Sequence, residues 1–301
     1  MQQKTLISII GPTAIGKTKL AIKMAQHYQT EIISCDSRQF FREMPIGTAA
    51  PTAEELSEAP HHFIGHRSVA ENYSIGQYEV DALAKLSELF ESHSVVVMVG
   101  GSGMYEKAVV EGLNTLPEAN AEHQHRLEHL LKTEGIEALQ NLLSTLDPAY
   151  YQTVDFHNPR RLLRAIDIIW QTGEPYSKII AKKPSQRDFK TFRVQISAPR
   201  EVVYQRINQR VEHMITQGLL EEVRALEPLQ HLVALQTVGY RELFQYLNGT
   251  WDWDFAISEI KKNSRRYAKR QLTWNRKLAI DAELPYLYSD KNLLSLLQSI
   301  R

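Results

Sequence analysis

A glycine-rich loop near the N-terminus has the residue types and spacing of a phosphate site. The pattern G-x-x-x-x-G-K-[ST] is matched in full by Gly11-Pro12-Thr13-Ala14-Ile15-Gly16-Lys17-Thr18. Successive backbone N–H groups of such a loop and the N-terminus of the following helix surround phosphate oxygens. Lys17 adds a positive charge, and the Thr18 hydroxyl is suited to ligate Mg²⁺. Since a chance match in a chain of this length has odds of about one in a hundred, we predict a phosphorylated ligand.

Asp36 is the acidic residue at a predicted strand end close to this loop. At the carboxyl edge of a parallel sheet it would face the ligand, as a Mg²⁺ ligand or as a general base. A single aspartate before a turn is also often a helix cap. The buried strand Val95–Val99 ends in Gly100-Gly101 without an acid, which argues against an ordinary nucleotide hydrolase.

Ser102 follows these glycines at the start of the next predicted helix. Its hydroxyl and the neighbouring amides are suited to stabilise negative charge on a phosphate. A plain glycine-rich connector would have the same composition, so the residues alone leave both interpretations open.

Alternating strands and helices must position these groups. Residues 5–10 and 31–34 and Val95–Val99 have the short, β-branched character of buried strands, and helical spacing follows the first and precedes the third. This order predicts an α/β fold, a P-loop NTPase-like parallel sheet core with helices on both faces.

From about Pro117 the pattern becomes helical, and the next predicted strand is Thr191–Ser197. We therefore expect an inserted all-helical domain at residues 117–195. The catalytic core would comprise residues 1–116 and 196–301, the second of these largely helical.

Composition and charge limit the classes of protein. With 43% apolar and 23% charged residues, the 301-residue chain is typical of globular proteins. No apolar run is long enough to span a bilayer, and one cysteine, Cys35, excludes a disulfide framework and a multi-cysteine zinc site. A cytoplasmic protein that does not bind membranes is expected.

The net charge of zero hides two basic zones. Residues 157–210 hold 12 basic and 4 acidic residues, and residues 260–277 hold 8 basic and no acidic residues. Such local zones favour a polyanionic partner, although solvated helix faces would have the same composition.

Several segments, taken together, resemble the tRNA dimethylallyltransferase family. They follow one another over nearly the whole chain: Gly11–Thr18, Asp36–Gln39, Ile46–Ala49, Pro51-Thr52, His61-His62, Gly100–Tyr105, Asn158–Ala165, Gly218–Val223, Gln236–Glu242 and Lys269–Trp274.

The resemblance implies transfer of a dimethylallyl group from dimethylallyl diphosphate to the N6 amine of the adenosine 3′-adjacent to the anticodon, in tRNAs reading codons that begin with U. The phosphate loop and Lys17 would hold the diphosphate with Mg²⁺ on Thr18. Asp36 matches the general base, and Ser102 stands where threonine is usual. Arg206 or Arg210 matches the catalytic arginine, and a surface salt-bridge stripe is their alternative role.

The acceptor base must leave the anticodon stack, so base flipping is expected, and the resemblance implies a monomer that binds the anticodon stem-loop. The residues it implies for tRNA contact are Asp36, Ser37, Arg38, Gln39, Ser102, Gln124, Arg160, Arg161, Leu162, Leu163, Arg164, Thr237, Gly239, Tyr240, Arg241, Lys269, Arg270, Gln271, Trp274 and Arg276. The chain departs from the family pattern at Ile15, Arg38, Phe41 and Gln124.

Three other functions remain open. An isopentenyltransferase acting on free adenosine phosphates would lack the helical insertion with its arginines. A P-loop small-molecule kinase would need an acidic metal ligand after a strand and would leave Asp36 and Ser102 without a role. A non-catalytic tRNA-binding relative would have no need of Lys17, Thr18 and Asp36.

Overall fold

The structure, a computed structural model, describes residues 3–114, 116–182 and 186–300. The chain forms two compact units, unit 1 from Met1–Val110 with Arg187–Arg301 and unit 2 from Glu111–Gln186. The boundaries expected from the sequence, after residues 116 and 195, lie slightly further along the chain than those of the structure, after Val110 and Gln186. The second differs because strand β5 (Lys190–Ser197) pairs with the central strand of unit 1.

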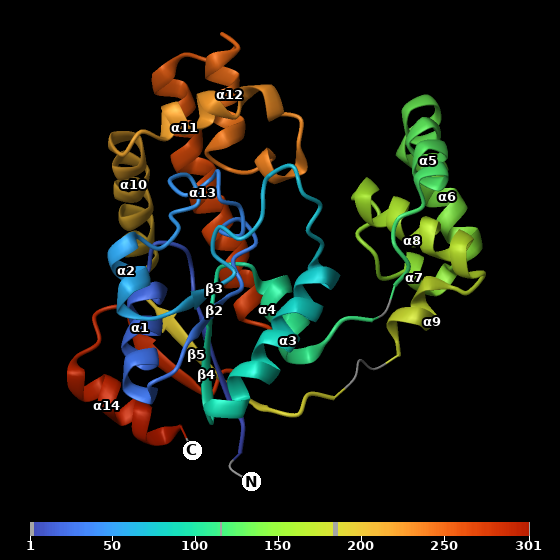
Figure 1. Ribbon diagram of the computed structural model, residues 1–301. Helices are drawn as coiled ribbons and strands as arrows, with labels where there is room; N and C mark the ends of the chain where they lie inside the picture. The colour runs from blue at the N-terminus through green and yellow to red at the C-terminus, as the bar shows by residue number, and fades with distance from the viewer. Residues whose placement is uncertain (1–2, 115, 183–185, 301) are drawn as a thin grey trace. The chain divides into compact units, whose positions relative to one another are not determined.

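Unit 1 is built on a six-stranded sheet in the order β3-β2-β4-β1-β5-β6, and all its strand pairs are parallel (Figure 1). The remaining strands are β1 (Thr5–Ile10), β2 (Ile32–Ser34), β3 (His61–His62), β4 (Val95–Val99) and β6 (Ala282–Pro285). The parallel sheet confirms the predicted α/β class.

Alternate residues of the strands enter two hydrophobic cores, because successive side chains of a strand point to opposite faces. Ile7 and Ile9 of β1 pack with residues of α1 and α10, whereas Leu6 packs with residues of α3 and α4. Helices therefore cover both faces of the sheet. The helices of unit 1 are α1 (Lys17–Tyr28), α2 (Ala53–Glu58), α3 (Ile75–Ser92), α4 (Gly103–Glu111), α10 (Arg200–Thr216), α11 (Leu219–Ala225), α12 (Tyr240–Leu247), α13 (Trp253–Asn275) and α14 (Asp290–Ser299), with short 3₁₀ helices η1 (Glu227–Leu229) and η2 (Val233–Leu235).

The C-terminal helices of unit 1 have a hydrophobic core of their own. Val211 of α10, Val223 of α11, Leu243 of α12 and Ile260 of α13 meet there. This packing fixes the rotation of α10 and α13 about their axes, and hence the direction of the polar side chains they carry.

Unit 2 contains only helices among its described residues. They are α5 (Ala121–Glu134), α6 (Ile136–Leu146), α7 (Pro148–Tyr151), α8 (Pro159–Thr172) and α9 (Tyr176–Ile180). Helix α5 ends at Gly135, whose φ is 80°. In the described part of the chain, no helix is long and apolar enough to cross a membrane.

Candidate active site

Three loops that carry the predicted chemical groups meet at one edge of the sheet. They follow β1, β2 and β4 and contain Lys17, Asp36 and Ser102, respectively. Since β2, β4 and β1 are parallel neighbours, their carboxyl ends lie side by side, as expected for ligand sites in such folds. Groups separated by up to 85 residues in sequence are thereby brought together.

The phosphate loop turns into α1 through a glycine with left-handed geometry. Gly16 has φ 101° and ψ 23°, which L side chains rarely adopt. Lys17 Nζ donates a hydrogen bond to the Pro12 carbonyl at 2.8 Å. Burial, and next the charge of Arg210, lowers the Lys17 pKa to about 8. A loop that holds a partly desolvated ammonium in this way is prepared for an anion.

Two arginines of α10 lie along the same loop. Arg206 Nε donates to the Ala14 carbonyl at 2.7 Å, and Arg210 donates to Thr13 Oγ1 at 3.3 Å. Arg206 is exposed, whereas Arg210 is partly buried, and its burial lowers its pKa. Both therefore face the phosphate loop, and Arg210 lies deeper in the site.

Asp36 has one carboxylate oxygen in a turn and the other in the site. Its Oδ1 accepts a hydrogen bond from the backbone N–H of Arg38 at 3.1 Å. No donor among the described residues pairs with Oδ2, which would lie 3.0 Å from a Cβ added at Gly101. Asp36 thus caps a turn and still offers a free oxygen, so the two roles considered from the sequence are compatible.

Ser102 joins two of the loops. The backbone N–H of Ser37 donates to Ser102 Oγ at 3.1 Å, and the two serine hydroxyls lie 2.9 Å apart. The next residue, Gly103, has no room for a side chain because an added Cβ would lie 2.4 Å from the Trp274 ring. In the structure, Ser102 holds the turn that begins with Asp36.

Helix α13 links the phosphate loop to the glycine-rich loop after β4. Gln271 Oε1 accepts from the Thr13 N–H, and its Nε2 donates to the Gly101 carbonyl, both at 2.8 Å. The Tyr267 hydroxyl donates to the same carbonyl at 3.1 Å. Gln271 is 7% exposed, so it acts as a bridge between loops. Local sequence patterns do not indicate this role, since 258 residues separate Thr13 from Gln271.

Two cavities of unit 1 meet at this junction. One, of about 670 Å³, is lined by the phosphate loop, including Lys17 and Thr18. The other, of about 560 Å³, is lined by Ser102, Trp274 and the apolar side chains of α10. Both cavities are lined by Thr13, Thr48, Asp36, Gly101, Arg210, Met214 and Gln271. A carboxylate with a free oxygen therefore lies between the cavity of the phosphate loop and a smaller, mostly apolar cavity.

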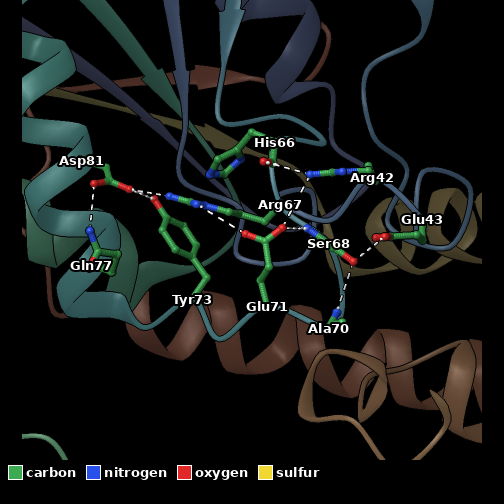
Figure 2. A network of polar contacts seen from close by, with 10 residues as sticks. All are labelled: Arg42, Glu43, His66, Arg67, Ser68, Ala70, Glu71, Tyr73, Gln77 and Asp81. Atoms are coloured by element: carbon green, nitrogen blue, oxygen red, sulfur yellow. Dashed lines mark hydrogen bonds and ion pairs between the residues drawn. The ribbon is translucent and has the colours of Figure 1, made fainter.

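A polar network holds the segment after β3 against the Asp36 loop, and Figure 2 shows Arg67 at its centre. Arg67 pairs with Asp81 at 3.1 Å and with Glu71 at 3.4 Å. Its backbone N–H donates to the Phe40 carbonyl, and its own carbonyl accepts from the Arg42 N–H. The network thus fixes the segment just beyond Asp36.

His66 contributes an acid-sensitive group to the same region. Its ring makes edge contacts with Phe40, Phe63 and Tyr73, and neither ring nitrogen has a hydrogen-bond partner in the described structure. Burial, and next the charge of Arg67, lowers the pKa of His66 to about 4. The imidazole is therefore neutral at physiological pH.

We expect this histidine to make the fold less stable in acid. In the unfolded chain, His66 has a pKa of 6.5 and takes up a proton below that pH. In the folded chain, the same imidazole is not protonated until about pH 4. The free energy of unfolding should therefore fall over this window, by about 1–2 kcal/mol after allowance for partial exposure. Urea unfolding at several pH values measures this change. His66→Phe should lose less stability over the same window; an equal loss in both proteins would contradict the expectation.

The sequence of the chain is similar to that of one protein family. A family model described as IPP transferase matches residues 39–278. A tRNA dimethylallyltransferase of Christiangramia forsetii is 54% identical over 95% of this chain and 94% of its own length. The chain belongs to the tRNA dimethylallyltransferase family. A second member, from Flavobacterium johnsoniae, is 49% identical over 90% of each chain.

Solved structures agree with this membership. The crystal structure of the full-length tRNA isopentenylpyrophosphate transferase of Bacillus halodurans has a TM-score of 0.73 and 34% identity, and the match covers 99% of this chain and 96% of that one. A eukaryotic dimethylallyltransferase, crystallised acting on tRNA, has a TM-score of 0.85 over 98% of this chain and 79% of its own. At 22% identity, the second structure shows the shared fold.

Two of the side chains that the resemblance to the tRNA dimethylallyltransferase family implies for tRNA contact are buried in the structure. Leu162 and Tyr240 are 0% exposed. Leu162 packs in the core of unit 2, and the Tyr240 hydroxyl donates to Glu222 at 2.6 Å. The structure corrects the expectation for these two side chains. The spacing of apolar residues Leu162, Ala165 and Ile169 on α8 is the sequence signal that marks this face as core.

Other members of the predicted set have internal partners. Arg164 pairs with the buried Asp167 at 2.9 Å and donates to the Pro117 carbonyl. Arg38 donates to the Ala234 carbonyl at 2.9 Å, and Gln39 donates to the Ala49 carbonyl at 3.0 Å. Leu163 packs against the core of unit 2, and Gly239 is buried.

The remaining members of the set lie on the surface or line a cavity. Those that are exposed are Gln124, Arg160, Arg161, Arg241, Lys269, Arg270 and Arg276. Thr237 and Trp274 line the mostly apolar cavity.

Proposed function

We propose that this protein transfers a dimethylallyl group from dimethylallyl diphosphate to the N6 amine of the adenosine directly 3′ of the anticodon, in tRNAs reading codons that begin with U. The observation that carries the proposal is the position of Asp36 between two joined cavities. One has the groups of an anion site, and the other has room and apolar surface for a base and a prenyl group. Family membership supports the same reaction.

The phosphate-loop cavity would bind the diphosphate. The loop N–H groups, Lys17 and Arg210 surround the space with donors and positive charge. We assign Arg210 to the diphosphate oxygen nearest the reacting carbon, because Arg210 lines both cavities. Arg206, which lines only the loop-side cavity and donates to the Ala14 carbonyl, would hold the loop in shape.

The residues of this cavity fit a magnesium ion bound largely through substrate. Thr18 Oγ1 has no hydrogen-bond partner among the described residues and lines the cavity. No cluster of three histidine, cysteine or acidic side chains suited to a metal occurs among the described residues. A single protein hydroxyl suits Mg²⁺, which prefers substrate phosphates and waters as its other ligands. When bound there, Mg²⁺ would neutralise charge on the departing diphosphate.

Asp36 would act as the general base. The N6 lone pair forms the new bond to C1 of the dimethylallyl group, the C1–O bond breaks, and its electron pair leaves with the diphosphate. The N6 proton moves to the free Oδ2 of Asp36. Ser102 and Gln271 hold the loops on either side of this point, so they keep carboxylate, carbon and amine aligned.

Unit 2 and the basic surface of α13 would bind the anticodon stem-loop. Arg160 and Arg161 are exposed at the start of α8, and Lys269 and Arg270 are exposed on α13. Such side chains bind phosphates and make affinity depend on salt. We therefore propose unit 1 as the catalytic core and unit 2 as a tRNA-binding domain.

The exposed arginines of α8 provide a test of that division. Arg160→Ala combined with Arg161→Ala should weaken stem-loop binding about tenfold at low salt and reduce the slope of log affinity against log salt by about two. The KM for dimethylallyl diphosphate should not change. Titration of fluorescent stem-loop at several salt concentrations measures both quantities.

Arg164→Ala is the matched control for these arginines. It removes an ion pair to the buried Asp167, so it should lower thermal stability more than it alters the salt slope. A normal salt slope in the double variant would place the RNA contact elsewhere.

The reaction itself is tested with two acceptors side by side. Labelled dimethylallyl diphosphate and Mg²⁺ are supplied with an anticodon stem-loop carrying three adenosines from the last anticodon position, or with free AMP or ATP. Label in the RNA alone is the expected result. Label in the free nucleotide alone would identify an adenosine-phosphate isopentenyltransferase. Phosphoryl transfer or ATP hydrolysis without prenyl transfer would contradict the proposal.

A further inference from the structure

A third cavity of unit 1, of about 360 Å³, adjoins the mostly apolar cavity of the active site. Gln236 and Arg241 line both spaces. Trp251 and Gln245 line the third cavity only. Its volume lies within the range of small-ligand pockets, and the reaction proposed above gives it no role.

Trp251 supplies a fixed aromatic surface in this cavity. Its backbone N–H donates to the Gln245 carbonyl at 3.1 Å, and its ring makes an edge contact with Phe255 at 5.0 Å between centroids. The ring is only partly buried. An aromatic side chain held in this way loses little conformational entropy when a planar ligand stacks on it.

Polar groups around the ring offer both donors and acceptors. The Gln245 amide makes no hydrogen bond within the described residues. The Gln236 amide donates to the Gln230 carbonyl at 2.6 Å, which leaves its oxygen available. Arg241 is exposed, and its guanidinium lies 3.9 Å from the Glu242 carboxylate. A stacking surface bordered by amides and a guanidinium has the chemistry needed to bind a nucleobase.

The connection between the cavities indicates which base would enter. If the mostly apolar cavity receives the target adenine, the nucleotide next to that adenine in the loop loses a stacking partner. Single-stranded RNA is recognised by splaying such bases onto aromatic side chains. We propose that this third cavity binds the base of a nucleotide flanking the target adenosine, stacked on Trp251 and hydrogen-bonded by Gln245. This inference rests on the proposed tRNA substrate.

The test is a double-mutant cycle between protein and RNA. Trp251→Ala and Gln245→Ala are each combined with stem-loops that carry an abasic site immediately 5′ or immediately 3′ of the target adenosine. Trp251→Ala should weaken binding of the intact stem-loop about tenfold, Gln245→Ala about threefold, and Trp251→Phe much less than Trp251→Ala. One of the two abasic stem-loops should bind the wild-type protein about tenfold more weakly than the intact stem-loop does. The Trp251→Ala variant should bind that abasic stem-loop and the intact stem-loop with equal affinity.

Additional measurements separate this proposal from a loss of fold or of function. The KM for dimethylallyl diphosphate and the thermal unfolding midpoint of Gln245→Ala should equal those of the wild-type protein. For both Trp251→Ala and Gln245→Ala, the loss of affinity from the substitution and that from the abasic site could instead add independently at both flanking positions. That result would overturn the proposed base pocket and leave the proposed tRNA prenylation standing. Failure of the wild-type protein to bind or prenylate any stem-loop would instead refute the proposed function, and with it this inference.

Discussion

Replacing Asp36 by asparagine is expected to lower kcat for prenyl transfer by about 10²–10⁴-fold, with little change in the Kd of the stem-loop. The amide has the shape of the carboxylate and can still accept the hydrogen bond that Oδ1 receives from the Arg38 N–H. The amide cannot take up the N6 proton, because the pKa of a protonated amide is far below that of a carboxylic acid. Only the transition state needs the base, so the loss should fall on kcat. Single-turnover rates with labelled dimethylallyl diphosphate measure it.

Asp36→Asn keeps the shape of the side chain, so it separates a catalytic role of Asp36 from a structural one. Asp36→Ala also removes the turn cap, so it should cost stability in addition to rate. Ser37→Ala is the matched control, because it removes one of the two contacts to Ser102 and leaves the carboxylate in place. Equal losses of rate and RNA affinity in Asp36→Asn would indicate a structural role for this residue.

Lys17→Met should lower kcat/KM for dimethylallyl diphosphate by about 10²–10³-fold. The ammonium lies in the phosphate loop, hydrogen-bonded to the Pro12 carbonyl, and a buried positive charge stabilises the diphosphate most as it leaves. Part of the effect should therefore appear in kcat and part in KM. Steady-state kinetics with varied diphosphate at saturating stem-loop separates the two.

No loss of stability should accompany this loss of activity. Burial lowers the pKa of Lys17, which means that the folded protein bears a cost for the charge at neutral pH. The thermal unfolding midpoint of Lys17→Met should be equal to or above that of the wild-type protein. Lys19→Met, at an exposed position on the wall of the same cavity, should lower kcat/KM much less than Lys17→Met and leave stability unchanged. A destabilised Lys17→Met protein would contradict this account.

The local chemistry of the site follows from contiguous residues. The phosphate loop depends on glycines and a lysine within eight positions, and its backbone geometry is set by those residues. The strand ends that carry Asp36 and Ser102 are marked by short buried runs followed by turn residues. Helix α8 of unit 2 is likewise delimited by Asn158-Pro159 and Gly173, which cap it in the structure. The sequence alone therefore determined the fold class, the glycine-rich loop and the carboxylate beside it.

The tertiary structure decided what depends on contacts between distant segments. Gln271 bridges to Thr13, Arg210 lies between two cavities, and Trp251 lines a third. The positions of Gln271 and Arg210 depend on how far α13 and α10 are rotated by their hydrophobic packing, and the position of Trp251 depends on the connection between α12 and α13. The same physics separates Arg160 and Arg161, which are exposed, from Leu162, which is buried. A motif match gives all three the same role, whereas the amphipathic face of α8 leaves only the arginines free to bind RNA.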